Sequence, residues 1–245
     1  MDFPLLVAVL APIVLLAYTT EAFTGFGASV IAVTLGANFY PIEKLVPVIV
    51  LLNIIVSSYI GFRHHRHADR HLLLRRILPN MAIGLAIGVA AFPCVQGVWL
   101  KWLLGAFVVV FAVRQLYLLK VSRSGGPPIS SLRASLFQVL AGVTHAFFST
   151  GGPPLVYSLG RMDLPKETFR ATLSLVWWVM SAALIVIFSL NGRIDREVLE
   201  LYVALIPTMP LGIWMGEKLH GRVDEHGFRM FIYLLLLISG IVLFF

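Results

Sequence analysis

The chain reads Thr24-Gly25-Phe26-Gly27 in the middle of one long apolar segment and Thr150-Gly151-Gly152-Pro153-Pro154 in the middle of another. The two threonines are 126 residues apart in a sequence of 245 residues, so the interruptions fall in matching halves. A helix interrupted inside a bilayer leaves backbone N–H and C=O groups unpaired, and it persists only where protein or a water-filled cavity satisfies them. Paired interruptions of this kind indicate the substrate site of a secondary transporter.

The composition also predicts a membrane protein. Hydrophobic residues make up 59% of the chain and charged residues 13%, with a mean hydropathy of +0.90, whereas a soluble domain has about 25% charged residues. Six apolar runs are long enough to be membrane spans, namely 3–20, 45–62, 77–95, 97–113, 171–190 and 228–245. The net charge of +7 requires no nucleic-acid partner, because the basic residues lie in short loops where cytoplasmic topology explains them.

Metal and cofactor sites are not expected. Cys94 is the single cysteine, so no intramolecular disulfide can form and no metal-ligand spacing exists. The histidine-rich loop at residues 63–67, together with His71, contains interleaved arginines that disfavour a divalent cation. This loop is instead expected to meet anionic membrane lipid.

The apolar runs and loop signals predict an all-α, polytopic transmembrane protein of seven or eight helices. Landmark residues repeat between the halves: Pro79, Gly84 and Gly88 precede Pro207, Gly212 and Gly216 by 128 residues each. The sequence therefore predicts two four-element repeats, each with a broken helix, at 1–121 and 132–245, joined by a cytoplasmic linker at 122–131. The eight expected elements are 4–37 (broken), 42–62, 71–92, 97–119, 131–160 (broken), 165–190, 196–217 and 226–245.

The two broken elements allow two topologies. Each could be a strongly tilted helix that is unwound near the membrane midplane, which is the favoured prediction, or a pair of half-helices that re-enter. If every element crosses once, the repeats are parallel, the N-terminus is cytoplasmic, and 11 basic residues lie inside against 8 elsewhere. If the broken elements re-enter, the number of crossings changes and an inverted repeat becomes possible.

Half-helices are expected to begin near Ala28 and Leu155, directly after the interruptions. Helix N-termini present free N–H groups and the positive end of the helix dipole, which favours an anion. Glycines allow a ligand to approach the backbone, and hydroxyls can donate to ligand oxygens. The predicted substrate site comprises Thr24, Gly25, Phe26, Gly27, Ser149, Thr150, Gly151, Gly152 and Pro153. Alternatively, the glycines mark close helix packing, which is common in membranes.

Three ionisable residues near the interruptions are further candidates. Glu21 lies in an apolar stretch, and an intramembrane acid is a candidate carrier of a coupled proton, although it could be a structural acid. His145 could donate to the anion or carry a proton, or simply pack in the core. Arg170 could pair with an oxyanion through its fork of donors, or extend to the membrane surface. Asn53 and Gln138 are expected to bond across helices, with substrate contact as the alternative.

One family is similar to this chain over almost its whole length. The segment Phe23-Thr24-Gly25-Phe26-Gly27, with the later turn Tyr40-Pro41, resembles the first motif of the sulfite exporter TauE/SafE group in the toluene sulfonate uptake permease superfamily. The segment His145-Ala146-Phe147-Phe148-Ser149-Thr150-Gly151-Gly152-Pro153-Pro154-Leu155-Val156-Tyr157, followed by Phe169-Arg170-Ala171-Thr172, resembles the second. The first motif is the looser one, because Ala28 stands where many members have a glycine.

The resemblance implies seven or eight transmembrane helices and export of sulfite or an organosulfur anion across a bacterial inner membrane. We therefore expect a transporter rather than an enzyme, working by alternating access, with the two interruptions forming one central site. If proton motive force drives export, the proton and the substrate should move in opposite directions. The alternatives are an anion channel, an intramembrane hydrolase that uses Ser149 and His145, and a membrane sensor that transports nothing.

Overall fold

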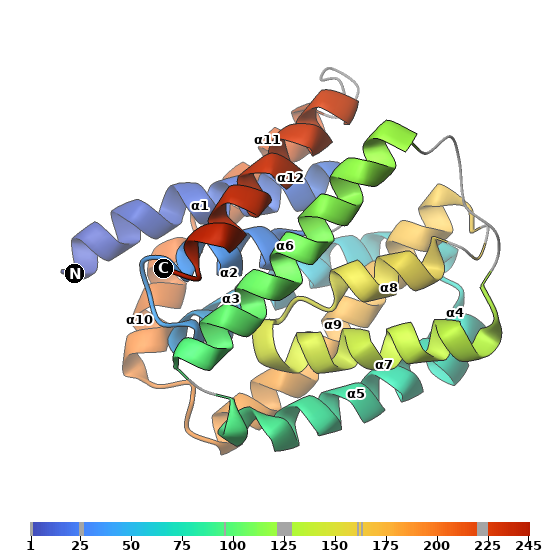
Figure 1. The fold of residues 1–245 in the computed structure, drawn as a ribbon, viewed down its shortest axis with the longest axis horizontal. Helices are drawn as coiled ribbons and strands as arrows, with labels where there is room; N and C mark the ends of the chain where they lie inside the picture. The colour runs from blue at the N-terminus through green and yellow to red at the C-terminus, as the bar shows by residue number, and fades with distance from the viewer. Residues whose placement is uncertain are drawn as a thin grey trace. The chain divides into compact units, whose positions relative to one another are not determined.

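The computed structural model describes residues 2–24, 27–95, 97–121, 129–160, 162, 164–219 and 225–245, and every regular element in these ranges is helical. The first half contains α1 (Phe3–Thr24), α2 (Ala28–Gly36), α3 (Ile42–His64), η1 (His65–His67), α4 (Arg70–Leu72), η2 (Leu73–Ile77), α5 (Leu78–Ala91), η3 (Phe92–Cys94) and α6 (Val98–Val121). The second contains α7 (Ser131–Phe148), α8 (Gly152–Leu159), α9 (Lys166–Leu190), α10 (Arg196–Leu205), α11 (Thr208–Leu219) and α12 (Glu225–Val242). The predicted all-α fold is confirmed (Figure 1).

Five described helices are long and apolar enough to cross a membrane, and a sixth span results if α10 and α11 are taken together. These two helices meet at a 40° bend that the sequence-based prediction of one element at 196–217 did not contain. Pro207 lies in the bend and explains it, because proline cannot donate to the preceding turn of a helix. At the matching place in the first half, Pro79 follows the π-helical turn η2. This turn also interrupts the regular hydrogen-bond pattern of an α-helix.

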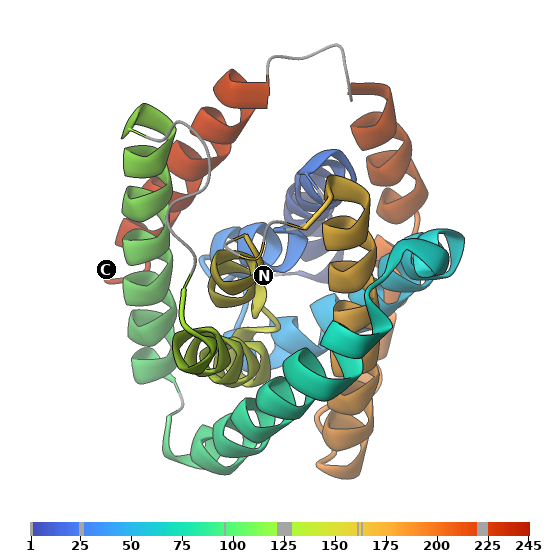
Figure 2. The ribbon, with the colours of Figure 1, turned by 90° about the vertical axis from the view of Figure 1, so that its right-hand side faces the viewer.

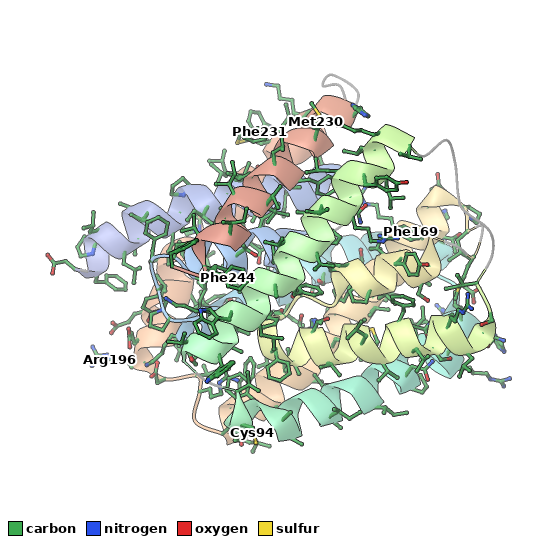
Figure 3. The ribbon with its side chains drawn as sticks, viewed as in Figure 1. Cys94, Phe169, Arg196, Met230, Phe231 and Phe244 are labelled. Carbon is green, nitrogen blue, oxygen red and sulfur yellow. The ribbon has the colours of Figure 1, made fainter. Side chains whose placement is uncertain are left out.

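The chain divides into two compact units, and each takes helices from both halves of the sequence. Unit 1 comprises residues 1–45, 95–124 and 197–245, and unit 2 comprises residues 46–94 and 125–196. In unit 1, α1 packs on α11, and α6 packs on α12. Phe244, which is labelled in Figure 3, follows α12. Its Cε2 atom lies 2.9 Å from the place of a Cβ on Gly105 in α6. In unit 2, α5 packs on α7. The two predicted sequence repeats stay a prediction.

Two of the landmark glycines, one in each unit, lie at close helix contacts. A Cβ on Gly84 of α5 would lie 1.9 Å from the Val139 carbonyl oxygen of α7, so only glycine allows this approach. In unit 1, a Cβ on Gly212 of α11 would lie 3.2 Å from the Leu15 carbonyl oxygen of α1. The glycines serve as small residues at close helix crossings, as membrane helices require. The landmark glycines 128 residues apart thus have the same packing role.

The second broken element is a re-entrant hairpin, so the favoured prediction of one tilted, unwound helix is wrong. Near the end of α8, the Ser158 hydroxyl contacts the Ala134 carbonyl oxygen at 3.4 Å, close to the beginning of α7. The rings of Phe137 and Tyr157 are 4.4 Å apart between centroids. The half-helix α8 therefore runs back along α7, and the two lie side by side in both ribbon views (Figures 1 and 2).

The first broken element folds back in the same way within unit 1. A Cβ on Gly36, the last residue of α2, would lie 3.3 Å from the Cδ2 atom of Leu10 in α1. The half-helix is nine residues long, or about 14 Å, which is less than half of a hydrocarbon core about 30 Å thick. A half-helix of this length can return only part of the way to the surface from which α1 came.

Contacts inside unit 1 show which helix ends share a membrane surface. Lys44, at the beginning of α3, pairs with Glu197, at the beginning of α10, with a distance of 2.9 Å between Nζ and Oε2. The Nε2 atom of His226, at the beginning of α12, lies 3.4 Å from the carbonyl oxygen of Leu119, near the end of α6. If each of the eight predicted elements crossed the membrane once, both pairs would join opposite surfaces.

Unit 2 leads to the same conclusion independently. The guanidinium of Arg193, after α9, lies 4.1 Å from the ring centroid of Phe92, after α5. At the other ends of these helices, Nε2 of His67 is 3.6 Å from Oε2 of Glu167. Single crossings by all eight elements would again separate both pairs, whereas re-entrant hairpins bring all of them together. The predicted cytoplasmic N-terminus assumed single crossings by all eight elements, and its orientation stays a prediction.

Candidate functional site

The tip of the α7–α8 hairpin is a tight, buried turn in unit 2. α7 ends at Phe148, and Ser149 follows it in the left-handed conformation (φ 54°, ψ 23°). The Ser149 N–H donates to the His145 carbonyl oxygen at 2.8 Å. Ser149 is the one described non-glycine residue with a positive φ. A residue held in this sparsely populated region is a sign of a constrained functional turn. The turn stops α7 and reverses the chain direction at this point.

α8 begins at Gly152, one turn earlier than the predicted start near Leu155. Pro153 and Pro154 fit into the first turn, because the N–H groups of that turn have no acceptor inside the helix. The first N–H that bonds within α8 belongs to Leu155 and reaches the Gly151 carbonyl oxygen at 3.3 Å. The N–H groups of Gly151 and Gly152 have no acceptor among the described residues, and no side chain caps the helix. These two donors are therefore unpaired in the described part of the structure.

His145 lies beside this terminus. Its ring stacks on the indole of Trp177 in α9, with centroids 5.7 Å apart and an interplanar angle of 18°. The side chain is 1% exposed, and among the described residues neither ring nitrogen has a hydrogen-bond partner. The main-chain carbonyl of Met180 faces the ring without completing a hydrogen bond.

Thr150 adds a further unsatisfied donor. The residue is 1% exposed, and its Oγ1 has no hydrogen-bond partner in the described part of the chain. Buried polar groups are almost always hydrogen-bonded, so each exception calls for an explanation. Within a few residues, the structure thus leaves the ring nitrogens, a hydroxyl and two backbone N–H groups unpaired. A ligand with acceptor atoms that binds here would explain all of them together.

The predicted need for glycine at this tip can be tested at two adjacent positions. A Cβ on Gly151 would lie 2.7 Å from the Ala141 carbonyl oxygen and 3.3 Å from the Cβ of His145, whereas a Cβ on Gly152 meets only Trp177, at 4.0 Å. We expect Gly151→Ala to lower the unfolding temperature and to reduce transport, because overpacking costs about 1–3 kcal/mol. Gly152→Ala is the matched control and should unfold near the wild-type temperature. Equal unfolding temperatures for the two variants would contradict the packing described.

Other polar side chains hold the hairpin in place. The Asn53 amide in α3 donates to the Ser149 hydroxyl at 3.3 Å, so the turn is tied to a neighbouring helix. The Asn80 amide donates to Gln138 at 2.7 Å, and the Gln138 amide donates to the Ser158 hydroxyl at 3.3 Å. The prediction that Asn53 and Gln138 bond across helices is confirmed. Their positions fix both ends of α8 relative to α7.

The hydrolase alternative finds no support in this geometry. A serine nucleophile needs a base within hydrogen-bond reach. The described hydrogen bond of the Ser149 hydroxyl joins it to Asn53, and neither ring nitrogen of His145 bonds to it. The two side chains come from neighbouring turns but do not form a catalytic pair in this structure.

The first interruption lies in unit 1 and is only partly described. Gly25, Phe26 and the side chain of Thr24 lie outside the described residues. Gly27 has φ 106° and precedes the first residue of α2, so this position requires glycine. α2 begins at Ala28, as predicted, and the Oε2 atom of Glu21 accepts a hydrogen bond from the Ala28 N–H at 3.2 Å. Glu21 is 8% exposed.

Two residues of α9 complete the comparison with the sequence-based site. Arg170 is half-buried near the beginning of α9, and its carbonyl oxygen accepts from the Ser174 hydroxyl at 3.0 Å. Its role at the substrate stays a prediction. Trp177 was not predicted, although it follows Arg170 by seven residues and therefore lies on the same helix face. The predicted site shared by both interruptions also stays a prediction.

Comparison with known families gives a match over most of the chain. The family model described as "Sulfite exporter TauE/SafE" matches residues 10–243, which include both hairpins. The chain belongs to the sulfite exporter TauE/SafE family. This membership makes it a membrane transporter with a small-molecule substrate, and it confirms the resemblance of the two motifs.

The TauE/SafE chain is also similar in sequence to a curated protein of Comamonas testosteroni named "Probable inner membrane transporter protein TsaS". The two sequences are 27% identical over 199 residues, which cover 80% of each chain. No solved structure matches the chain.

Proposed function

We propose that this protein is a secondary transporter that exports a small sulfur-containing anion, such as sulfite or an organosulfonate, across the bacterial inner membrane. The family name and the name of the Comamonas relative support a transporter in that membrane. The observation that carries the anion assignment is the tip of the α7–α8 hairpin, where the N–H groups of Gly151 and Gly152 have no acceptor among the described residues and lie beside a buried hydroxyl and imidazole without partners.

The chemistry of this tip favours an oxyanion over a cation or a neutral solute. Gly151 and Gly152 offer two backbone N–H groups at the positive end of α8, while the two prolines that follow offer none. Thr150 and His145 add donors from side chains that are buried. Backbone N–H groups at a helix N-terminus can replace part of the hydration shell of an anion.

In the proposed cycle the anion binds at this tip, and the hairpins and their neighbouring helices move to expose it to either side. Arg170 is proposed to assist with its positive charge. Glu21 remains a candidate for proton coupling, because an ionisable residue inside the membrane is a functional candidate by default. The first interruption is proposed to contribute to the same pathway through Thr24, Gly25, Phe26 and Gly27.

We infer a membrane orientation opposite to the sequence-based prediction for the N-terminus. With both hairpins re-entrant, the arginine-rich loop at 63–76, the linker at 122–131 and the segments 160–167 and 218–226 share one surface. Of the nineteen basic residues, only Lys44, Lys101, Arg193 and Arg196 then belong to the other surface. The positive-inside rule makes the arginine-rich surface cytoplasmic and places residues preceding α1 outside the cytoplasm. The two halves are then an inverted repeat.

The function is tested by flux measurements with the purified protein in liposomes. We expect saturable flux of sulfite, sulfonates or thiosulfate, with little flux of acetate, under imposed pH gradients. Linear, unsaturable flux would indicate a channel, and no flux of any of these anions would contradict the proposal. In the same assay, an unaltered pH dependence in Glu21→Gln would exclude this residue as the proton carrier.

A further inference from the structure

The two interruptions differ in what occupies the first turn of the half-helix that follows. Glu21 precedes Ala28, the first residue of α2, by seven residues, and its carboxylate accepts the Ala28 N–H at 3.2 Å. His145 precedes Gly152, the first residue of α8, by the same seven residues. No side chain caps the first turn of α8. Counted back from the half-helix that follows, the same position thus carries an acid at one hairpin and an imidazole at the other.

The position of the acid has a direct physical reason. A carboxylate with little exposure to water is costly unless charge-assisted hydrogen bonds replace its hydration. The N-terminus of a helix supplies such bonds together with a favourable dipole. Conversely, the first N–H groups of a half-helix inside the protein need an acceptor. Glu21 and the terminus of α2 therefore satisfy each other, whereas the first N–H groups of α8 have no such partner among the described residues.

We propose that Glu21 is a tethered anion that fills the N-terminus of α2, so that the protein holds its own carboxylate at one hairpin and binds the substrate anion at the other. This assignment rests on the proposed function for the terminus of α8. It gives the chain one exchangeable anion site, formed by His145, Thr150, Gly151 and Gly152 in unit 2. It also means that removal of the carboxylate creates a second site, which takes a small carboxylate such as formate.

Chemical rescue tests the proposal. We expect Glu21→Ala to unfold at a lower temperature than the wild type, and added formate to restore part of the loss. Calorimetric titration should count about one sulfite per wild-type chain, and about two anions per chain for Glu21→Ala when sulfite and formate are both present. Glu217→Ala, which removes an exposed acid at the end of α11, is the matched control and should not respond to formate. No effect of formate on Glu21→Ala would overturn the proposal.

A second measurement keeps the test independent of whether Glu21→Ala folds. Difference infrared spectra between the wild type and Glu21→Gln should reveal the stretch of an ionised carboxylate that is missing in the variant. A protonated carboxylic acid stretch at neutral pH would overturn the proposal, because a neutral acid is not an anion. If the wild type binds no sulfite, the proposed function fails, while the infrared and formate results still decide the state of Glu21.

Discussion

His145→Phe is expected to weaken sulfite binding by about tenfold to hundredfold, since a lost hydrogen bond to a charged ligand costs about 1.5–3 kcal/mol. The phenyl ring can still stack on Trp177, as the imidazole does, but it lacks both unpaired nitrogens. Thr150→Val removes the unpaired hydroxyl without a large change in shape and should weaken binding through the same mechanism. Calorimetric titration of the purified variants with sulfite measures both effects.

A neighbouring threonine provides the control for these substitutions. The Thr144 hydroxyl in α7 already contacts the Leu140 and Ala141 carbonyl oxygens, at 3.1 and 3.2 Å. Thr144→Val should therefore leave the affinity for sulfite unchanged, and His145→Gln, which retains a donor, should lose less than His145→Phe. Wild-type affinity in both His145→Phe and Thr150→Val would rule out the tip of the α7–α8 hairpin as the binding site.

Labelling of single cysteines is expected to distinguish the topology with two re-entrant hairpins from the topology in which all eight elements cross the membrane once. Cys94, which is exposed after α5 (Figure 3), provides the natural reference, because both topologies place it outside the cytoplasm. With Cys94 replaced by alanine, we expect a membrane-impermeant maleimide to label Asp2→Cys and Asn191→Cys from outside intact cells. Ser131→Cys, next to the linker, should react only after the membrane is permeabilised.

The opposite pattern at two of these positions is the alternative outcome. If all eight predicted elements crossed the membrane once, residues 2 and 191 would face the cytoplasm and would be protected in intact cells. Protection of both positions, with Cys94 labelled, would also contradict the pairing of Lys44 with Glu197 and the stacking of Arg193 on Phe92 in the folded protein. The experiment thus tests whether the hairpins are re-entrant without changing any residue of the proposed substrate site.

The helices and their interruptions were predictable because their causes are local. Apolar runs, glycine clusters and prolines determine where a helix can continue, and α2 begins at Ala28 as expected. The direction in which a chain leaves an interruption depends instead on distant contacts, such as that of Ser158 with Ala134. Hydrophobic periodicity does not contain that information. The sequence did contain one signal for the hairpins, namely the shortness of the half-helices. The turn at Pro41 follows the first interruption after fewer residues than a helix needs to cross the membrane.

The candidate site shows the same division between local and distant causes. Thr150, Gly151 and Gly152 were predicted from their neighbours in sequence, and they do lie at a buried helix terminus with unpaired donors. The contact of His145 with Trp177 joins two helices and has no local signature. Glu21 was singled out as an intramembrane acid, but helix periodicity did not predict its hydrogen bond to the Ala28 N–H.

The central claim is that the N-terminus of α8, where no side chain caps the first N–H groups, binds the substrate anion. Its most direct test is a structure of the protein with selenite, the heavier analogue of sulfite, located by anomalous scattering. We predict a peak within hydrogen-bond distance of the Gly151 and Gly152 N–H groups, beside His145. A peak among the arginines of the loop at 63–76, with the terminus of α8 covered by protein atoms, would contradict the claim.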